Sequence, residues 1–253
     1  MPSAPVTIIT GAGSGIGRAA AIRLARSGHR LVLAGRRRPM LEESERVARE
    51  AGAPDVLVQP ADLADPSNAR VLIDATLQQF GRIDALVNNA GYVENIPIAE
   101  TDEALLHRTL AVNTVGPSLL ISRLWPAFVA QGGGRIVNVT SYATIDPFPG
   151  LYAYAQAKGA AMLQVKAVHN EGQAHGIRAF AVAPGAVETP MLRGLFDETV
   201  VPRAMTLDPD TVAQVIAACV LGERDSESGE TIPLPSPGPD SRPDSESAAE
   251  TEP

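Results

Sequence analysis

The glycine-rich turn near the N-terminus constrains the fold more than any other feature of this sequence. The apolar run Val6–Thr10 leads directly into Gly11-Ala12-Gly13-Ser14-Gly15-Ile16-Gly17, and a helical pattern follows. Glycines lack a Cβ atom, so a backbone rich in them can turn tightly and approach a ligand, while a helix N-terminus offers unpaired N–H groups to an anion. Ile16 replaces the last glycine of G-x-G-x-x-G, so the pattern that fits is T-G-x-x-x-G-x-G. Alone, it predicts either a phosphate-binding loop or an ordinary tight turn between strand and helix.

Short apolar runs alternate with longer helical patterns along the chain. The expected strands are Val6–Thr10, Arg30–Ala34, Val56–Gln59, Asp84–Asn88, Arg135–Thr140, Arg178–Ala183 and Glu230–Leu234. The expected helices cover about 15–28, 39–51, 66–80, 101–130, 152–175 and 209–221, and Asp65-Pro66 and Asp208-Pro209 place a capping acid before a proline at two helix starts. This alternation predicts an α/β fold, namely a doubly wound, Rossmann-like parallel sheet in three layers. We expect residues 1–234 to form this single domain.

The acidic charge lies mainly at the C-terminal end. Residues 225–253 hold eight acidic residues and one basic residue, while the whole chain has a formal net charge of −8. The rest is close to neutral and has no basic stripe, so we expect no nucleic-acid partner. Residues 235–253 are rich in proline, serine and acidic residues, which predicts a disordered acidic tail; a tail that binds a partner is the alternative.

Cysteine and histidine usage argues against a metal site. Cys219 is the only cysteine, so neither an intrachain disulfide nor a thiolate cluster can form, and the four histidines show no zinc-binding motif. The N-terminus lacks a basic region, and no run approaches the roughly 18 apolar residues of a membrane span. We therefore expect a cytoplasmic protein with no metal and no membrane partner.

The residues after the second expected strand bear on the choice of dinucleotide. A site for NAD usually has an acidic residue here that binds the ribose 2′-hydroxyl, whereas this chain has Gly35-Arg36-Arg37-Arg38. The planar guanidinium suits a 2′-phosphate, so Arg36 and Arg37 predict NADP(H) in preference to NAD(H). The alternative is a solvated arginine run that opens the next helix.

Other candidate contacts follow the third and fourth expected strands. Asp62 and Leu63 could lie beside the adenine, and Asn89, Ala90 and Gly91 beside its ribose. The carboxyl ends of parallel strands meet at one edge of the sheet, where ligands of doubly wound folds bind. Each residue could instead simply cap the end of its strand.

A candidate proton-transfer group lies on the expected helix 152–175. Tyr154 and Lys158 are four residues apart and so share one face of that helix. An ammonium beside a phenol stabilises the phenolate, so we expect a lowered pKa for Tyr154. Taken alone, the pair is more typical of a boundary tyrosine beside a solvated lysine than of a catalytic pair. Ser141, directly after the fifth strand, could hold a substrate oxygen.

Asn113 stands in the middle of an expected helix, where asparagine is mildly unfavourable. We expect its side chain to bond a group beyond its own helix; a buried amide that braces nearby backbone is the alternative.

Together these motifs resemble those of the short-chain dehydrogenases/reductases, in their single-domain branch. The resemblance runs from about residue 5 to residue 222 and rests on Thr10-Gly11-x-x-x-Gly15-x-Gly17, Asn88-Asn89-Ala90-Gly91, Asn113, Ser141, Tyr154-x-x-x-Lys158 and Pro184-Gly185-x-Val187-x-Thr189. It implies that Tyr154 is the general acid/base, that Lys158 lowers its pKa and binds the nicotinamide ribose, that Ser141 orients the substrate oxygen, and that Asn113 holds a water. It also implies two groups of cofactor contacts: Gly11, Ser14, Gly15, Ile16 and Gly17 at the phosphates, and Pro184, Gly185, Val187 and Thr189 at the nicotinamide.

The implied activity is hydride transfer between NADP(H) and a small alcohol or carbonyl compound. An epimerase or dehydratase that retains its cofactor, and a nucleotide-sensing or scaffold protein without turnover, are the alternatives. The apolar residues near 92–98, 142–150 and 190–205 hint at a modestly hydrophobic substrate. Residues 190–207 could form a lid or an ordinary packed excursion. The resemblance also implies a homodimer or homotetramer, although the glycine-rich stretch that often supports the tetramer is replaced here by the tail.

Overall fold

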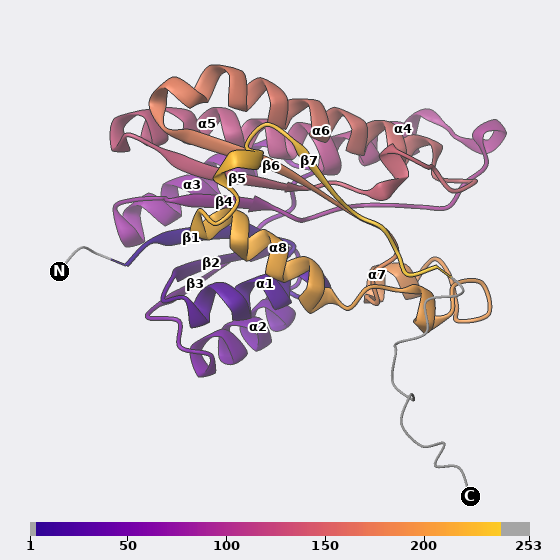
Figure 1. Cartoon of the computed structure of the whole chain (residues 1–253), viewed down its shortest axis with the longest axis horizontal. Coiled ribbons are helices and arrows are strands. Elements are labelled where there is room, and N and C mark those ends of the chain that lie inside the picture. The colour runs from indigo at the N-terminus through magenta and orange to yellow at the C-terminus, as the bar shows by residue number, and fades with distance from the viewer. Residues whose placement is uncertain (1–3, 239–253) are drawn as a thin grey trace, which may run out of the picture.

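A parallel seven-stranded sheet with helices on both faces forms the body of the protein (Figure 1). The computed structural model describes residues 4–238. Its strands are β1 (Val6–Thr10), β2 (Arg30–Gly35), β3 (Val56–Pro60), β4 (Ala85–Asn88), β5 (Gly134–Val139), β6 (Ile177–Pro184) and β7 (Thr231–Leu234). They lie in the order β3-β2-β1-β4-β5-β6-β7. The strand order reverses between β1 and β4, so a crevice opens beyond the carboxyl ends of these two strands, and the predicted doubly wound fold is confirmed.

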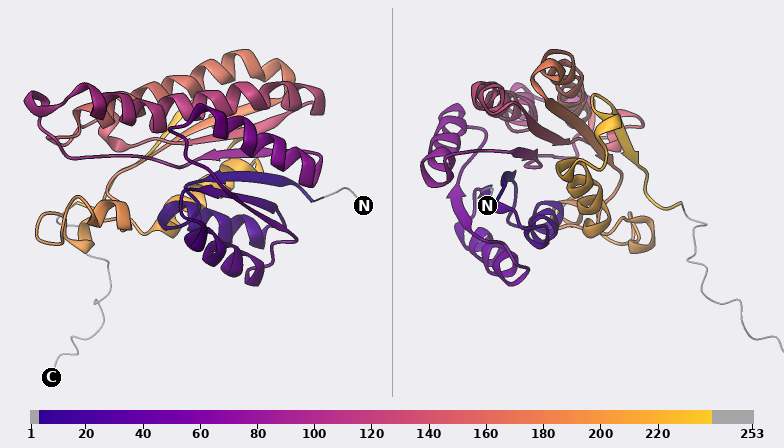
Figure 2. Two further views of the ribbon diagram at one scale, coloured as in Figure 1. Left: turned by 180° about the vertical axis from the view of Figure 1, so that it is seen from behind. Right: turned by 60° about the vertical axis from the view of Figure 1, so that its left-hand side comes forward.

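The helices of residues 4–238 divide between the two faces of the sheet (Figures 1 and 2). They are α1 (Gly15–Arg26), α2 (Arg38–Glu50), α3 (Pro66–Phe80), α4 (Glu103–Leu110), α5 (Gly116–Gln131), α6 (Tyr152–Gly172), α7 (Pro190–Arg193) and α8 (Pro209–Leu221). Helices α1, α2 and α8 pack with Ile9 and Leu33 of the sheet, and α3, α5 and α6 pack with Ile8 and Val32. Because both faces are covered, the strands are continuous apolar runs.

The two predicted aspartate caps are confirmed. Asp65 precedes α3 and its carboxylate accepts from the Ser67 N–H at 2.9 Å. Asp208 precedes α8 and accepts from the Asp210 N–H at 2.7 Å. In each case proline occupies the first helical position, where a backbone N–H would have no partner within the helix, so the missing N–H costs no hydrogen bond.

The helix expected over 101–130 is present and runs from Glu103 to Gln131, but it is not a regular α-helix throughout. The structure has α4, a wide π-helical turn at Ala111–Val115, and then α5. Pro117 cannot donate to the Asn113 carbonyl one turn earlier, and its ring would clash with that carbonyl in a regular α-helix. The Asn113 side chain also donates to the Thr109 carbonyl at 2.9 Å. The widened turn accommodates both residues, and such turns are frequent at functional sites.

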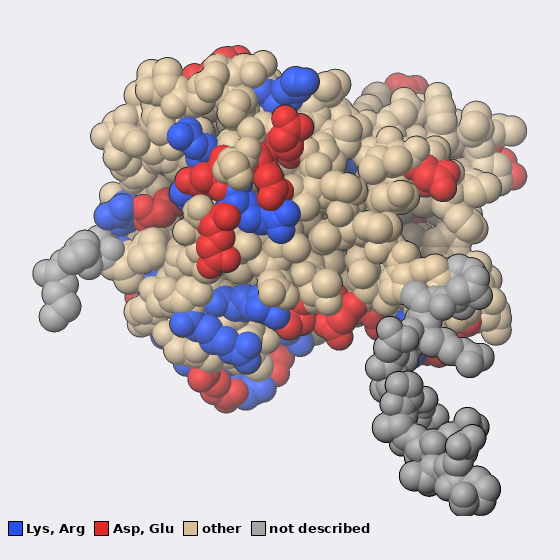
Figure 3. Space-filling view, viewed as in Figure 1, with Lys and Arg blue, Asp and Glu red and all other residues tan. Residues whose placement is uncertain are grey.

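Several further expectations concern the surface and the end of the chain. No helix of residues 4–238 is long and apolar enough to cross a membrane. On the face shown in Figure 3, basic and acidic side chains adjoin one another and form no continuous basic surface. The structure describes four residues of the predicted tail, 235–238, and the remainder of it, 239–253, lies outside the described residues.

Candidate active site

A cavity of about 840 Å³ lies at the carboxyl ends of the strands. The turns that follow β1 to β6 form its walls, together with the segment 189–201 and Ser236. It collects the candidate residues named from the sequence with the exception of Gly17 and Asn113, namely Gly11, Ser14, Gly15, Ile16, Arg36, Arg37, Asp62, Leu63, Asn89, Ala90, Gly91, Ser141, Tyr154, Lys158, Pro184, Gly185, Val187 and Thr189. Gly17 and Asn113 act from behind this lining, as described below.

The glycine-rich turn has the geometry of an anion-binding loop. Gly11 and Gly15 have φ of +66° and +51°, a region that other residues rarely adopt. A Cβ atom on Gly17 would lie 2.4 Å from the Gly11 carbonyl oxygen, so only glycine lets α1 start this close to the turn. Ser14 caps α1 without a side-chain hydrogen bond, and the first turn has no acidic residue. The N–H groups at this end are therefore suited to a phosphate.

Asn89 and Thr10 tie the ends of β1 and β4 together. The Asn89 amide donates to the carbonyl oxygens of Thr10 and Gly11 at 2.9 and 3.2 Å, and the Thr10 hydroxyl accepts from the N–H groups of Asn89 and Ala90, each at 3.0 Å. Sequence reasoning treated Thr10 only as part of a pattern. Its supporting role depends on partners about 80 residues away, which no local signal reveals.

Two arginines mark one end of the cavity. Arg36 and Arg37 are exposed, and neither has an acidic partner within residues 4–238, whereas Arg38 lies 3.7 Å from Glu42. The run also leads into α2, as the helix-opening interpretation expects. The Asp62 carboxylate accepts from the Ala64 N–H at 3.0 Å, so it shapes its own turn as well as lining the cavity.

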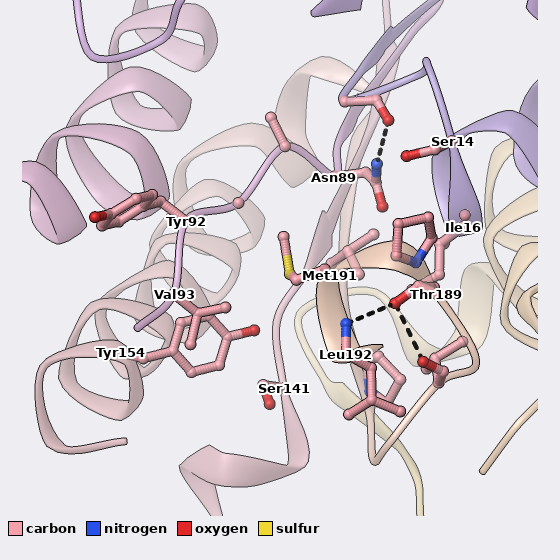
Figure 4. A pocket seen from close by; sticks show the side chains of 18 of the residues that line it. Ser14, Ile16, Asn89, Tyr92, Val93, Ser141, Tyr154, Thr189, Met191 and Leu192 are labelled. Carbon is pink, nitrogen blue, oxygen red and sulfur yellow. Dashed lines mark hydrogen bonds between the residues drawn. The ribbon is translucent and has the colours of Figure 1, made fainter. Parts of the chain in front are cut away.

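Tyr154, Ser141 and Lys158 meet at the opposite end. Figure 4 shows the Tyr154 hydroxyl and Ser141 directed toward the same space. Lys158 is buried, its Nζ donates to the Val139 carbonyl oxygen at 2.8 Å, and it lies 5.7 Å from the centre of the Tyr154 ring. The ammonium is thus held at the end of β5, beside the phenol, where Lys158 lines the cavity.

The pKa of Tyr154 is shifted opposite to the sequence-based expectation. Burial raises the pKa of Tyr154 to about 12, and the hydrogen bond with Ser141 only partly offsets this. Burial also lowers the pKa of Lys158 to about 8. The expected lowering by Lys158 is wrong for the protein alone, because removing the phenolate from water outweighs an ammonium that is held by the Val139 carbonyl.

Asn113 braces backbone on the far side of the cavity wall. Its amide donates to the Tyr92 carbonyl oxygen at 2.7 Å and accepts from the Tyr92 N–H at 3.2 Å. Its side chain therefore bonds a group beyond its own helix, as predicted, and that group is backbone. The Asn113 oxygen would also lie 3.2 Å from a Cβ atom on Gly91, so this position favours glycine.

The segment 190–207 covers one side of the cavity. Thr189 caps the short helix α7 by accepting from the Leu192 N–H at 3.3 Å, and Arg193 pairs with Glu188 at 2.5 Å. Met191 reaches into the middle of the cavity, between Tyr154 and the turn at Ser14 (Figure 4). No sequence pattern predicted Met191 as a cavity residue, because only the path of the chain after Thr189 brings its side chain into the cavity.

Several known proteins are similar to this chain over most of its length. A family model for short chain dehydrogenase matches residues 5–199. The 2-(R)-hydroxypropyl-CoM dehydrogenase of Xanthobacter autotrophicus is 38% identical over 229 residues, which cover 85% of this chain and 90% of that protein. The levodione reductase of Leifsonia aquatica is 36% identical over 74% of this chain and 71% of that protein.

Solved structures show the same fold. The 3-ketoacyl-(acyl-carrier-protein) reductase of Brucella melitensis, complexed with NADH, superposes with a TM-score of 0.84 at 30% identity, over 91% of this chain and 96% of that one. The match of the family model over most of the chain and the shared α/β fold lead to one conclusion: the chain belongs to the short-chain dehydrogenase/reductase family, whose members are oxidoreductases acting on alcohol and ketone groups.

Proposed function

We propose that this protein transfers hydride between NADP(H) and a small alcohol or carbonyl compound, with Tyr154 as the general acid/base. The observation that carries the proposal is the arrangement of groups along one cavity. A glycine-rich turn lies at one end, beside two guanidiniums that have no acidic partner among residues 4–238, and a buried phenol lies next to an ammonium at the other end. When bound, the nicotinamide supplies or accepts the hydride, and its oxidised form adds a positive charge at this end.

The residues that would hold the cofactor follow from this spacing. Gly11, Ser14, Gly15, Ile16 and Gly17 would serve the phosphates, Arg36 and Arg37 the 2′-phosphate, and Asp62 and Leu63 the adenine. Asn89, Ala90, Gly91, Lys158 and Tyr154 would serve the riboses, and Pro184, Gly185, Val187 and Thr189 the nicotinamide. The cradle fits such a ligand, because a Cβ atom on Gly15 would lie 2.8 Å from the Thr189 methyl group and would close the gap between turn and loop.

The preference for NADP(H) rests on Arg36 and Arg37. The relative from Brucella melitensis is complexed with NADH, and a xylitol dehydrogenase at 26% identity is NAD⁺-bound, so the fold alone does not favour a 2′-phosphate. Arg36 and Arg37 are exposed, line the cavity and have no acidic partner among the described residues. Each guanidinium could therefore form a charge-assisted hydrogen bond with a 2′-phosphate.

Cofactor titration tests this preference. Arg36→Ala and Arg37→Ala are each expected to weaken NADPH binding by about 10- to 100-fold and to leave NADH binding unchanged, since a hydrogen bond to a charged group contributes about 1.5–3 kcal/mol. Arg38→Ala is the matched control, because Arg38 faces Glu42 and does not line the cavity. Tighter binding of NADH than of NADPH by the unmodified protein would contradict the proposal.

The protonation states suit the role proposed for Tyr154. With a pKa of about 12 in the protein alone, the phenol is protonated at neutral pH and can give its proton to a carbonyl oxygen held by Ser141. For alcohol oxidation the phenol must act as a base, and the Lys158 ammonium together with the charge of the oxidised cofactor would lower its pKa.

A pair of tyrosine variants tests this role. Tyr154→Phe is expected to lower kcat by about 10²- to 10⁴-fold with little change in cofactor binding, because it removes only the transferable proton. Tyr152→Phe, an exposed tyrosine on the same helix, is the control and should keep full activity. Equal rates for the wild type and Tyr154→Phe would exclude Tyr154 as the acid/base.

We also propose a cytoplasmic homodimer or homotetramer. Leu163 on α6 is 68% exposed, and Tyr152 and Val115 on the neighbouring surface are also exposed, which leaves an apolar area that a second subunit would cover. Light scattering of the wild type and of Leu163→Glu tests this proposal. A monomeric wild type would contradict it.

A further inference from the structure

The chain segment that follows β7 contributes to the cavity. β7 lies beside β6, with Leu234 opposite Pro184, and the chain then continues past the carboxyl edge of the sheet toward α7 (Figure 1). Ser236 in this continuation lines the cavity. From composition alone this residue falls in the predicted disordered tail, so no local pattern predicts that it lies at the site.

Ser236 contacts the loop that follows β6. The Ala186 N–H donates to the Ser236 hydroxyl oxygen at 2.7 Å, and the Gly185 N–H donates to the Leu234 carbonyl oxygen at 2.8 Å. A Cβ atom on Gly185 would lie 2.4 Å from the Ser236 hydroxyl oxygen and 2.7 Å from its backbone nitrogen. The two segments therefore pass each other so closely that residue 185 has no room for a side chain.

The carbonyl group of Ala186 is held from the end of the segment 190–207. The Leu207 N–H donates to the Ala186 carbonyl oxygen at 2.8 Å, and the Glu188 N–H donates to the Leu207 carbonyl oxygen at 2.9 Å. Ala186 is thus clamped between Leu207 and Ser236. Removing the Ser236 hydroxyl would take away the acceptor of the Ala186 N–H. Ala186 would then keep its bond to Leu207, and the loop could move on the side that faces Ser236.

The loop so held is joined to both ends of the cavity. Three residues beyond Ala186, the Thr189 methyl group lies against Gly15 of the glycine-rich turn. Thr189 also caps α7, which carries Met191, and the Met191 methyl group and the Lys158 ammonium both lie close to Gly91. A displacement of Ala186 therefore reaches the floor of the cavity where the nicotinamide is proposed to bind.

We propose that Ser236 is a positioning residue, whose hydroxyl fixes the loop Gly185–Thr189 in the geometry that hydride transfer requires. This inference rests on the proposed function, since it assumes that the loop binds the nicotinamide. Ser236 acts through Ala186 and transfers no proton itself. Its loss should affect the chemical step more than folding, because hydride transfer depends steeply on alignment, whereas one hydrogen bond of a half-buried hydroxyl contributes only about 1 kcal/mol to stability.

Variants of the full-length protein test the proposal with NADPH and a carbonyl substrate that the wild type reduces. Ser236→Ala is expected to lower kcat/KM by about 10-fold or more, mainly in kcat or in cofactor affinity, with a small change in Tm. Ser236→Thr keeps the hydroxyl and should restore activity to within about twofold of the wild type.

Ser228→Ala is a matched control from the segment just before β7. The Ser228 hydroxyl accepts from the Ala179 N–H at 3.1 Å, the same kind of bond, but it lies near the start of β6 and away from the cavity. This variant should lower Tm and leave kcat/KM within about twofold. Equal kinetics for Ser236→Ala and the wild type, or an equal loss of kcat/KM in Ser228→Ala, would overturn the proposal.

A double variant separates the contact from other effects. Gly185→Ala should disturb the same contact, because its Cβ atom displaces Ser236. The loss of activity in Gly185→Ala/Ser236→Ala should therefore match the larger single loss, while a product of the two losses would count against a shared contact. A wild type that binds NADPH and turns over while Ser236→Ala is unaffected refutes only this inference; a wild type that binds neither cofactor refutes the proposed function as well.

Discussion

Replacing the buried lysine of the site should stabilise the cofactor-free protein. Lys158 is 4% exposed, and burial alone lowers its pKa from 10.5 to about 8. This difference corresponds to about 3.4 kcal/mol of disfavour for the charged form in the folded state, at 1.36 kcal/mol per pKa unit. Lys158→Met keeps a similar shape without the charge, but it leaves the Val139 carbonyl unpaired, which costs about 1–3 kcal/mol. We expect a net gain of about 1–2 kcal/mol at pH 7, together with loss of activity.

The pH dependence has a definite sign. Below pH 8 the amine is protonated in both the folded and the unfolded chain, so the wild type bears the full penalty. Between the folded pKa of about 8 and the unfolded value of 10.5, the folded state releases its proton first, and stability rises with pH. The advantage of Lys158→Met over the wild type should therefore shrink as pH is raised from 7 to 9.5.

Urea denaturation of the cofactor-free protein at pH 7 and pH 9.5 measures both quantities. Lys166→Met on the same helix is the control, since Lys166 is exposed and its replacement should alter stability by less than about 0.5 kcal/mol at either pH. A stability difference between Lys158→Met and the wild type that is the same at both pH values would refute the reasoning, because the lysine would then not be desolvated.

Three further predictions follow from buried contacts. Asn113→Ala removes three hydrogen bonds, two of them to Tyr92, and should reduce the free energy of unfolding by about 3 kcal/mol in a denaturation experiment. Gly17→Ala places a Cβ atom 2.4 Å from the Gly11 carbonyl oxygen and should weaken NADPH binding by at least about 10-fold in a fluorescence titration; unchanged affinity would exclude this contact. Cys219 is fully buried and burial raises its pKa to about 12, so iodoacetamide at pH 8 should modify it only after unfolding, as intact mass would show.

Local patterns in the sequence were enough for most of the fold. Strands buried on both faces are continuous apolar runs, and the aspartate-proline pairs mark helix starts through bonds to the next turn. The helix over 101–130 was predicted without its π-helical turn at Ala111–Val115. That turn depends on Asn113 reaching Tyr92 on another element and on Pro117 lacking an N–H, and hydrophobic periodicity detects neither.

Short-range patterns also predicted most of the residues that line the cavity, but they did not predict the pKa of Tyr154. The glycine-rich turn and the pair Tyr154 and Lys158 are short-range features, fixed by neighbouring residues in the chain. The direction of the Tyr154 pKa shift depends on how many atoms exclude water from the phenol, and these come from several elements. Considered only as helix neighbours, the two side chains gave the opposite sign.

The sequence by itself determined the doubly wound sheet, the glycine-rich turn and the shared helix face of Tyr154 and Lys158, because spacing along the chain sets each of them. Only the tertiary structure decided which side chains support the site and how the buried groups hold their protons. The bond between Ala186 and Ser236 spans 50 residues, and the burial of Lys158 depends on the atoms packed around it. Contacts between distant segments and the exclusion of water arise only when the whole chain has packed, so no local pattern encodes them.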